Sequence, residues 1–310
     1  MPKFHVSRSI DIAASPEQVF DVVADYGTWA SWSPWLCCEP EAEVKVTDDP
    51  RSVGSMYSWT GDAVGAGELE HEFLERGRRI EDEIRFLKPF KSTSKVAFDF
   101  APRGDGTRVT WHMNGSLPWF MFWMTSMMET FIGLDYERGL RMLKERIELG
   151  SVQGETKVHG VVTDGPYAIA GVRRKCSFDE IGTSMEAAFT VARRSLEEKN
   201  LPTNGEAISI YHNIDMKNRT FDYTSGFAVP ESVSAPPAGL VFEKIPKTKA
   251  FHVEQLGSYN HIGNGWAAAH QVARYQKLKI AKTPGFEIYR NDPQETPVLD
   301  LKTDIYLPIR

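Results

Sequence analysis

The sequence has few cysteines and no apolar run at its start long enough for a signal peptide. Its three cysteines, Cys37, Cys38 and Cys176, form one adjacent pair and one single residue. This pattern indicates neither a disulfide framework nor a metal site, and the eight histidines show no ligand spacing. We therefore expect a reduced, cytoplasmic protein without a metal or another cofactor.

A membrane-spanning segment is also lacking. The longest apolar stretch, residues 117–134, is borderline in length for a span of about 20 residues. Four residues interrupt it: Pro118, Thr125, Ser126 and Glu129. The sequence therefore predicts no stable membrane insertion, and we expect this stretch to line the core or a pocket.

An excess of positive charge is missing as well. The 310 residues carry 36 basic and 42 acidic side chains, a formal net charge of −6. Phosphate contacts need a basic surface, so nucleic acid is not an expected partner. The acidity lies in residues 1–150, where 17 basic and 24 acidic side chains give −7, whereas residues 151–310 have 19 and 18 and give +1.

The chain does contain enough residues for two domains, since a domain takes roughly 150 residues. Apolar residues make up 41% and charged residues 25%, which is ordinary globular composition. Residues 150–156 are small and polar, as is typical of a linker. We therefore expect domains at residues 1–150 and 151–310.

The second half contains an internal duplication. Residues 178–192 align with residues 259–273 at an offset of 81, and six of the fifteen pairs are identical. Residues 210–213 match residues 288–291 at an offset of 78. Such a repeat predicts two copies of one supersecondary unit. The copies, at about 157–230 and 240–310, each follow the pattern strand, helix, strand, strand, so we expect a duplicated βαββ domain.

Alternation along these strands sorts the side chains onto two faces of a sheet. We assign one set to a face packed under the two repeat helices: Ile208, Ile210, Phe227, Val229, Phe286, Ile288, Ile305 and Leu307. The opposite face, which the helices leave uncovered, then carries Tyr211, Glu287, Tyr289 and Tyr306. This prediction places a carboxylate among phenols.

Glu287 is the strongest candidate site residue of the second half. A carboxylate in a partly desolvated aromatic groove can pair with a ligand cation, while the rings offer π faces. With a pKa raised by burial, it could also act as a general acid or base. The alternative is an exposed strand glutamate paired with a lysine. Trp266 and Tyr259, at the start of the second repeat helix, either wall this groove or pack in the core.

The first half predicts an antiparallel sheet around one long helix. Ser15, Pro16 and Gln18 form a helix start with a capping box. An apolar stripe at helical spacing predicts a second helix from about 126 to 148. Strands are expected at about 4–12, 39–47, 54–60, 67–75, 79–87, 92–100 and 107–115. With the repeats, this makes the whole chain an expected α+β protein.

A two-residue turn at residues 76–77 would pair Phe73 with Ile80 and His71 with Asp82. The second pair faces the apolar side, where it is either an orienting pair with His71 as a proton shuttle or a satisfied polar pair. Several aromatic side chains are expected to line a cavity, with plain core packing as the alternative. They are Trp29, Trp32, Trp35, Trp59, Phe98, Trp111, Trp119, Phe122 and Phe131.

Residues 3–148 resemble the START-like (SRPBCC, polyketide-cyclase-like) helix-grip family. The resemblance lies in Ile-Asp-Ile-Ala-Ala-Ser-Pro-Glu-Gln-Val-Phe at 10–20, in Trp-Ala-Ser-Trp-Ser-Pro-Trp at 29–35 and in the terminal helix. It implies an antiparallel sheet that grips a long C-terminal helix. It also implies a pocket between sheet and helix, in which family members hold lipids, polyketides or hormones.

Residues 157–310 resemble the GyrI-like effector-binding domain that is attached to AraC-type and MerR-type regulators. The resemblance lies in Phe-Glu-Ile-Tyr-Arg-Asn-Asp-Pro at 286–293, in Thr-Asp-Ile-Tyr-Leu-Pro-Ile at 303–309 and in the duplication. It implies a groove between the repeats for aromatic or cationic compounds, with Glu287 at the position of the family's buried acidic residue. This chain departs from regulator architecture, because no helix-turn-helix segment is found in it.

Three functions stay open at this point. The first is a cytoplasmic two-domain binding protein for hydrophobic or cationic small molecules, which serves sequestration, sensing or resistance. The second is a hydrolase or cyclase acting on a small hydrophobic compound, with Glu287, His71 or Asp82 as the acid/base group. The third is a protein-interaction or transcription-regulation accessory, similar to a gyrase inhibitor, whose protein partner the sequence does not identify.

Overall fold

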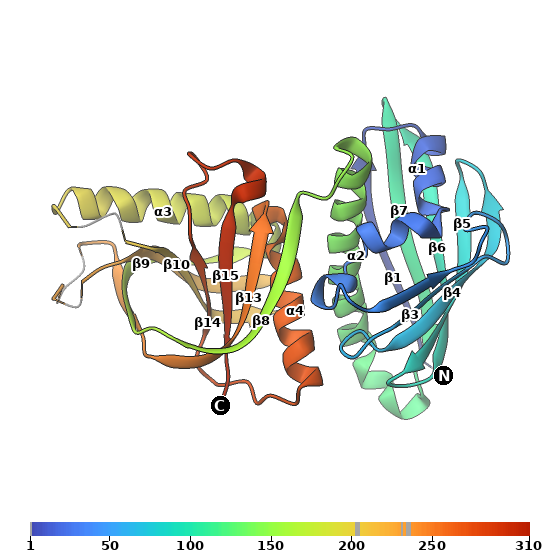
Figure 1. The fold of residues 1–310 in the computed structure, drawn as a ribbon. Helices are drawn as coiled ribbons and strands as arrows, with labels where there is room; N and C mark the ends of the chain where they lie inside the picture. Colours follow the sequence, from blue (N-terminus) through green and yellow to red (C-terminus); the bar gives the residue numbers. More distant parts are fainter. Residues whose placement is uncertain (1, 202–204, 231, 234–236) are drawn as a thin grey trace. The chain divides into compact units, whose positions relative to one another are not determined.

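The computed structural model describes residues 2–201, 205–230, 232–233 and 237–310. The chain divides into two compact units, unit 1 (residues 1–153) and unit 2 (residues 154–310) (Figure 1). Each unit combines one antiparallel sheet with helices, and unit 1 carries a long C-terminal helix. The predicted α+β fold class is therefore confirmed.

Unit 1 is a seven-stranded antiparallel sheet with the order β1-β7-β6-β5-β4-β3-β2. The strands are β1 (Lys3–Ile12), β2 (Glu43–Val46), β3 (Met56–Thr60), β4 (Ala66–Glu75), β5 (Arg79–Lys88), β6 (Ser92–Arg103) and β7 (Gly106–Ser116). The helices are α1 (Pro16–Val23) and α2 (Thr125–Glu148), with the short 3₁₀ helices η1 (Tyr26–Ser31), η2 (Leu36–Cys38) and η3 (Trp119–Met124). Helix α2 packs along β1 and buries Tyr136, Leu140 and Leu143 (Figure 1).

Helix α1 begins with the capping box that the sequence predicts. Ser15 Oγ accepts a hydrogen bond from the Gln18 amide at 3.3 Å, and Gln18 Oε1 accepts one from the Ser15 amide at 3.0 Å. This capping box satisfies amide groups that a helix end leaves without partners. The helix then turns Val19, Phe20 and Val23 into the core.

The hairpin of β4 and β5 confirms that His71 lies opposite Asp82, although its turn and its register differ from the prediction. The turn has three residues, with the Arg78 amide donating to the Glu75 carbonyl, so the pairing near the turn is shifted by one residue. A β-bulge between His71 and Phe73 shifts it back. The predicted Phe73–Ile80 pair is therefore wrong: Phe73 lies opposite Glu81 and is exposed.

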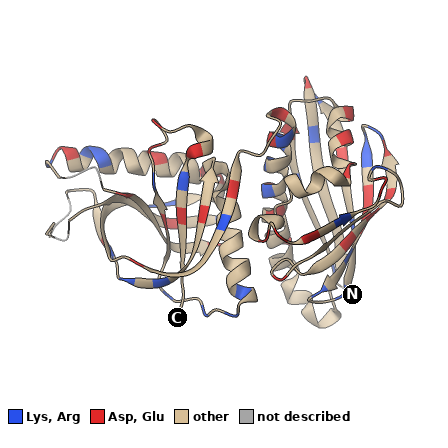
Figure 2. Ribbon diagram, in the orientation of Figure 1, with Lys and Arg blue, Asp and Glu red and all other residues tan. Residues whose placement is uncertain are grey.

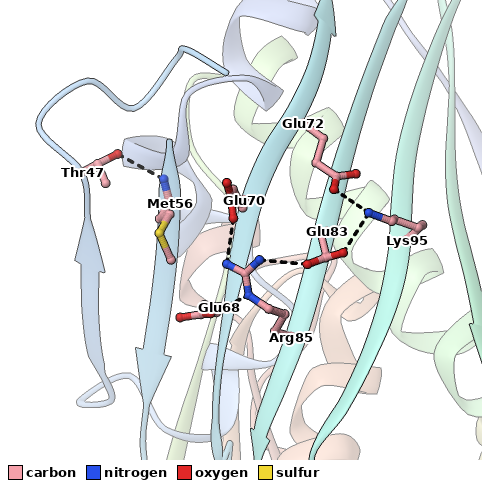
Figure 3. Close-up of polar contacts among 8 residues, drawn as sticks. All are labelled: Thr47, Met56, Glu68, Glu70, Glu72, Glu83, Arg85 and Lys95. Atoms are coloured by element: carbon pink, nitrogen blue, oxygen red, sulfur yellow. Dashed lines mark hydrogen bonds and ion pairs between the residues drawn. The ribbon is translucent and has the colours of Figure 1, made fainter. Parts of the chain in front are cut away.

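The outer face of this sheet carries ion pairs where the inner face carries the core (Figure 3). Arg85 donates to Glu68 at 2.6 Å and to Glu83 at 2.9 Å. Lys95 donates to Glu72 at 2.5 Å and to Glu83 at 2.9 Å. Such exposed pairs add little stability each, but they show plainly which face of the sheet meets solvent.

The segment 117–134 is not the core element that the sequence predicts. No side chain of η3 is buried, and Trp119, Phe122 and Phe131 are exposed, so their assignment as cavity walls is wrong. The apolar composition of this segment does not predict burial, because apolar side chains occur both in the core and on the surface of proteins. In the part of the chain that the structure describes, no helix is both long and apolar enough to cross a membrane.

Unit 2 is an eight-stranded antiparallel sheet with the order β12-β9-β11-β10-β14-β15-β13-β8. The strands are β8 (Gly154–Asp164), β9 (Tyr167–Ser177), β10 (Ala207–Asp215), β11 (Thr220–Ala228), β12 (Val241–Ile245), β13 (Thr248–Gly257), β14 (Gly285–Tyr289) and β15 (Lys302–Pro308). The main helices are α3 (Ile181–Glu197) and α4 (Ile262–Tyr275), preceded by η4 (Phe178–Glu180) and η5 (Tyr259–His261); η6 (Val298–Asp300) precedes β15.

The predicted repeats correspond to β9-α3-β10-β11 and β13-α4-β14-β15, and β10 pairs with β14 where they meet. Two further strands were missed by the sequence analysis. β8 pairs with β13 of the second repeat, and β12 pairs with β9 of the first. Most side chains of β8 are not buried, so this edge strand lacks the apolar alternation that marks a strand.

The predicted assignment of side chains to the two faces of this sheet is partly wrong. Ile208, Ile210, Phe286 and Ile288 pack in one cluster together with Tyr306, on the face away from the helices. That cluster draws residues from six strands, including β12 and β13, which lie far apart in the sheet order, so the sheet must curve around it.

The face under the helices is the one that carries Glu287. Phe227 and Val229 pack with α3 residues, and a Cβ on Gly265 of α4 would overlap the side chain of Ile305. Ile305 lies directly opposite Glu287 in the ladder, so the two share this face. Both faces of the central strands are buried, and alternation therefore could not tell which of them the helices cover.

Candidate functional site

Glu287 of β14 is fully buried and accepts three hydrogen bonds from side chains of unit 2. Its Oε1 accepts from the Tyr211 hydroxyl at 2.9 Å and from Trp266 Nε1 at 2.5 Å. Its Oε2 accepts from the Tyr289 hydroxyl at 2.5 Å. The donors come from β10, α4 and β14, so both repeats contribute to this carboxylate site.

The aromatic donors are held by packing against the repeat helices. The indole of Trp266 lies over the start of β14, where a Cβ on Gly285 would come within 2.6 Å of Trp266 Cη2. The Tyr211 ring meets this indole edge-on at 5.6 Å. Tyr289 is enclosed by Phe189 of α3 and by Tyr259, each with ring centres 5.5 Å away. The carboxylate is thereby fixed inside an aromatic box.

No positive charge balances Glu287 among the described residues. Burial raises the pKa of Glu287 above its ordinary value, and the hydrogen bonds from Tyr289, Trp266 and Tyr211 oppose this rise. An exposed glutamate paired with a lysine, the alternative considered from the sequence, is excluded by this burial. A buried carboxyl group with donors but without a counter-charge is suited to a cation brought by a ligand.

Tyr306 does not belong to this group. Its ring stacks on Phe286 and on His252, with centres 4.8 Å apart in both cases, and its hydroxyl accepts from Arg290 at 3.0 Å. The prediction that it shares a face with Glu287 is wrong, because Tyr306 lies opposite Phe286 in the ladder and Ile305 lies opposite Glu287. A shift of one residue moves every side chain of a strand to the other face.

Unit 1 contains a buried pair of polar side chains, His71 and Asp82. His71 Nδ1 lies 2.5 Å from Asp82 Oδ1, and both side chains are completely buried. His71 Nε2 lies 3.0 Å from the Ala24 carbonyl, which can only accept, so this nitrogen must carry a proton. One further proton is then shared between Nδ1 and the carboxyl group. Burial raises the pKa of Asp82, and the hydrogen bond to His71 opposes the rise.

Two buried polar atoms near this pair, Trp111 Nε1 and Tyr136 Oη, have no hydrogen-bond partner among the described residues. The Tyr26 hydroxyl lies beside Asp82 and is placed to donate to its carboxylate. The Tyr26 ring stacks on His71, and the Tyr136 ring stacks on Trp111, each at 3.9 Å. Burial, and then nearby negative charges that include Asp82, raise the pKa values of both phenols. Since buried polar groups normally have partners, the two unpaired atoms indicate a place for water or a ligand.

The remaining aromatic candidates surround these atoms in unit 1. Phe98 and Trp111 are buried and stack at 4.9 Å. Trp35 is half-buried, meets Trp111 edge-on at 5.8 Å and donates from Nε1 to Asp135 Oδ2 at 3.0 Å. No group of His, Cys, Asp or Glu side chains able to hold a metal ion occurs in the described ranges.

Sequence reasoning missed several residues of both sites. Met185 and Phe189 of α3 contact Tyr289, and their spacing of four residues on one helix face was a usable signal. Tyr26 lies in the 3₁₀ helix η1, where no simple periodicity marks an inward side chain. Tyr136 of α2 is buried, and its unpaired hydroxyl could only be found in the structure.

The fold and the two sites define an α+β chain in which a helix-grip unit is followed by a duplicated βαββ unit. Residues 3–148 match the family described as polyketide cyclase / dehydrase and lipid transport, and residues 160–310 match the GyrI-like small molecule binding domain. Each half of the chain thus matches one of the two families. Both are small-molecule-binding families.

Solved structures resemble the halves of the chain one at a time. Protein CV1439 from Chromobacterium violaceum is 20% identical over 48% of this chain and 99% of its own, with a TM-score of 0.37. CalU16 from Micromonospora echinospora is 16% identical over 47% and 85%, with a TM-score of 0.34. The EcmrR C-terminal domain is 15% identical over 51% and 98%, with a TM-score of 0.42. No curated protein matches the chain.

Proposed function

We propose that this chain is a cytoplasmic binding protein for hydrophobic cations, which it sequesters or senses or to which it gives resistance. The observation that supports the proposal is Glu287, a buried carboxyl group without a counter-charge, held by Tyr211, Trp266 and Tyr289. The faces of such rings attract a cation that has lost its water, and the carboxylate supplies the opposite charge. An apolar body on the ligand suits the aromatic surroundings.

The test compares two probes that differ in charge alone: phenyltrimethylammonium and its neutral isostere tert-butylbenzene. In the Glu287→Gln variant, the affinity for the cation is expected to fall about tenfold or more, a loss of about 1.4 kcal/mol. The affinity for the neutral probe should change by less than about twofold. Titration calorimetry on the full chain measures both affinities.

The matched control is Glu186→Gln, which removes the same charge from an exposed position of α3. It should leave both affinities unchanged, since an exposed carboxylate interacts weakly through water. An equal loss for both probes in the Glu287→Gln variant would contradict the proposal, because it would indicate a change of shape instead of a lost charge interaction.

A second binding function, in unit 1, is favoured by the unpaired polar atoms. We propose that Tyr26, Trp111, Tyr136 and Asp82 hold an apolar molecule with a hydroxyl or carbonyl oxygen. Trp111 Nε1 and Tyr136 Oη can each donate to an oxygen of such a molecule, and the Tyr26 hydroxyl with Asp82 offers a further donor and acceptor. The ring clusters of this core suit the apolar remainder of such a molecule.

Tyr136→Phe tests this second site with 2-naphthol and 2-methylnaphthalene as probes. Its free energy of unfolding should stay equal or rise by about 1 kcal/mol, because the removed hydroxyl has no partner in the protein. Binding of 2-naphthol should weaken about fivefold, while binding of 2-methylnaphthalene should not change. Equal binding of 2-naphthol by variant and wild type would contradict this site. Conversion of a bound probe by the wild type would favour an acid–base role of His71 and Asp82.

A further inference from the structure

One end of unit 1 exposes a group of large apolar side chains, here called the aromatic end. Phe90 is 82% exposed and Trp119 is 76% exposed. The group as a whole comprises Leu87, Phe90, Trp119, Phe120, Phe122, Trp123, Met127 and Phe131. Monomeric proteins rarely expose so many large apolar side chains together, and such a patch usually marks an interaction surface.

The strand ends show that these residues lie at one end of the sheet. β5 ends at Lys88 and β6 begins at Ser92, so the loop that contains Phe90 joins these two strands. β6 pairs with β7, with Lys95 opposite Asn114, and η3 follows the end of β7. The loop and η3 therefore leave neighbouring strands in the same direction. The Leu117 amide also donates to the Pro2 carbonyl, which brings the start of β1 to this end.

The lysines of unit 1 that form no ion pair with a described residue lie at the same end. Of the six lysines of this unit, Lys45, Lys95 and Lys144 form ion pairs with glutamates. The other three, Lys3, Lys88 and Lys91, are exposed and form no ion pair with any described residue. Lys88 and Lys91 flank the Phe90 loop, and Lys3 begins β1 opposite Ser116.

This end lacks the strong negative charge of the unit as a whole, because it carries Lys3, Lys88 and Lys91 beside the acidic Glu39, Asp62 and Glu129. Residues 1–150 carry a net charge of −7, but residues 117–128 contain no charged side chain at all. Figure 2 shows η3 and the first turn of α2 in tan, without the blue or red of a charged residue. The nearest acidic group in the sequence is Glu129, whose Oε1 accepts from the His5 amide at 3.4 Å. In a symmetric contact between two copies through this end, the lysines of both copies would face each other, which charge repulsion disfavours.

We propose that the aromatic end docks on the surface of a lipid bilayer that contains anionic lipids. Tryptophan and phenylalanine side chains enter the boundary between headgroups and acyl chains, and lysines bind anionic headgroups. Docking of this kind needs no membrane-spanning helix. The inference goes beyond the proposed function, since it concerns a surface remote in sequence from Glu287. It would bring the proposed binding site of unit 1 to the membrane, in which hydrophobic molecules collect.

The test is sedimentation of the full chain with vesicles of phosphatidylcholine, with or without about 30% phosphatidylglycerol. We expect binding to the anionic vesicles, weakening with salt, together with a blue shift of tryptophan emission. The triple variant Trp119→Ser, Phe122→Ser, Trp123→Ser should reduce the vesicle partition coefficient about tenfold or more. Lys88→Glu with Lys91→Glu should reduce it on anionic vesicles to a similar extent.

The matched control is Val298→Ser with Leu299→Ser, which removes exposed apolar side chains from unit 2. It should bind vesicles like the wild type, and circular dichroism should show that all variants fold, because the changed residues are exposed. Three results would overturn the proposal: no binding to anionic vesicles at low salt, equal binding to neutral vesicles, or full binding by the triple variant. A wild-type dimer that the triple variant abolishes, without vesicle binding, would identify a second copy as the occupant and also overturn it.

Discussion

Replacing His71 with leucine is expected to lower the free energy of unfolding of unit 1 by about 3–5 kcal/mol. His71 and Asp82 are both completely buried and bonded to each other, so the substitution leaves the carboxyl group without its partner. Urea denaturation followed by tryptophan fluorescence measures this loss, because seven of the eight tryptophans lie in unit 1. The exposed His5, replaced in the same way, serves as the control and should change stability by less than about 0.5 kcal/mol.

A second substitution shows whether the His71–Asp82 pair serves stability or ligand binding. In the His71→Leu background, Asp82→Val removes the stranded carboxyl group and should restore about 2 kcal/mol or more, because an apolar pair of similar volume replaces a buried polar pair at little cost. If the double variant folds but no longer binds 2-naphthol, the pair serves the ligand site and not stability. A loss below about 1 kcal/mol for His71→Leu alone would contradict the observed burial of the pair.

The correct prediction of the His71–Asp82 pair came about through two compensating errors. The sequence predicts a two-residue turn at 76–77 where the turn has three residues, and it does not predict the bulge after His71. Each error moves the register by one residue, and in opposite directions. Between turn and bulge the predicted pairing therefore fails, as Phe73 shows, whereas beyond the bulge it holds. A bulge depends on packing that period-two alternation does not record.

In unit 2 the sequence placed Glu287 with Tyr211 and Tyr289, but it placed Tyr306 with them as well. The first grouping needs alternation along two strands and the assumption, which is correct, that Ile208, Ile210, Phe286 and Ile288 share a face. The second needs the register of β14 against β15, which a long connection between Tyr289 and Lys302 leaves undetermined. Hairpins with short turns fix their own register, and long connections do not. The exposure of the side chains of the aromatic end could not be predicted for another reason. Whether a side chain is buried depends on the fold, and composition does not record it.

Replacing Glu287 with alanine is expected to lower the free energy of unfolding of unit 2 by about 3 kcal/mol or more. The substitution leaves Tyr211, Trp266 and Tyr289 as three donors without their acceptor. Glutamine, in contrast, keeps this geometry: its oxygen accepts from Trp266 and Tyr211, and its amide donates to a Tyr289 hydroxyl that has turned. Amide hydrogen exchange along β10 and β14 reports on unit 2 alone and measures the difference.

The pH dependence of stability separates lost hydrogen bonds from lost charge. Burial raises the pKa of Glu287 in the folded chain, so between the ordinary carboxyl pKa and this raised value the folded state holds a proton that the unfolded state has released. Stability from this group is complete below a pH of about 4 and declines as the pH rises toward the raised pKa. Glu287→Gln cannot titrate, so its stability relative to the wild type should grow over that interval and then level off. Urea denaturation followed by circular dichroism at several pH values measures this gap. A gap that shrinks with rising pH would mean that the folded chain holds an ionised Glu287 throughout, with the hydrogen bonds outweighing burial.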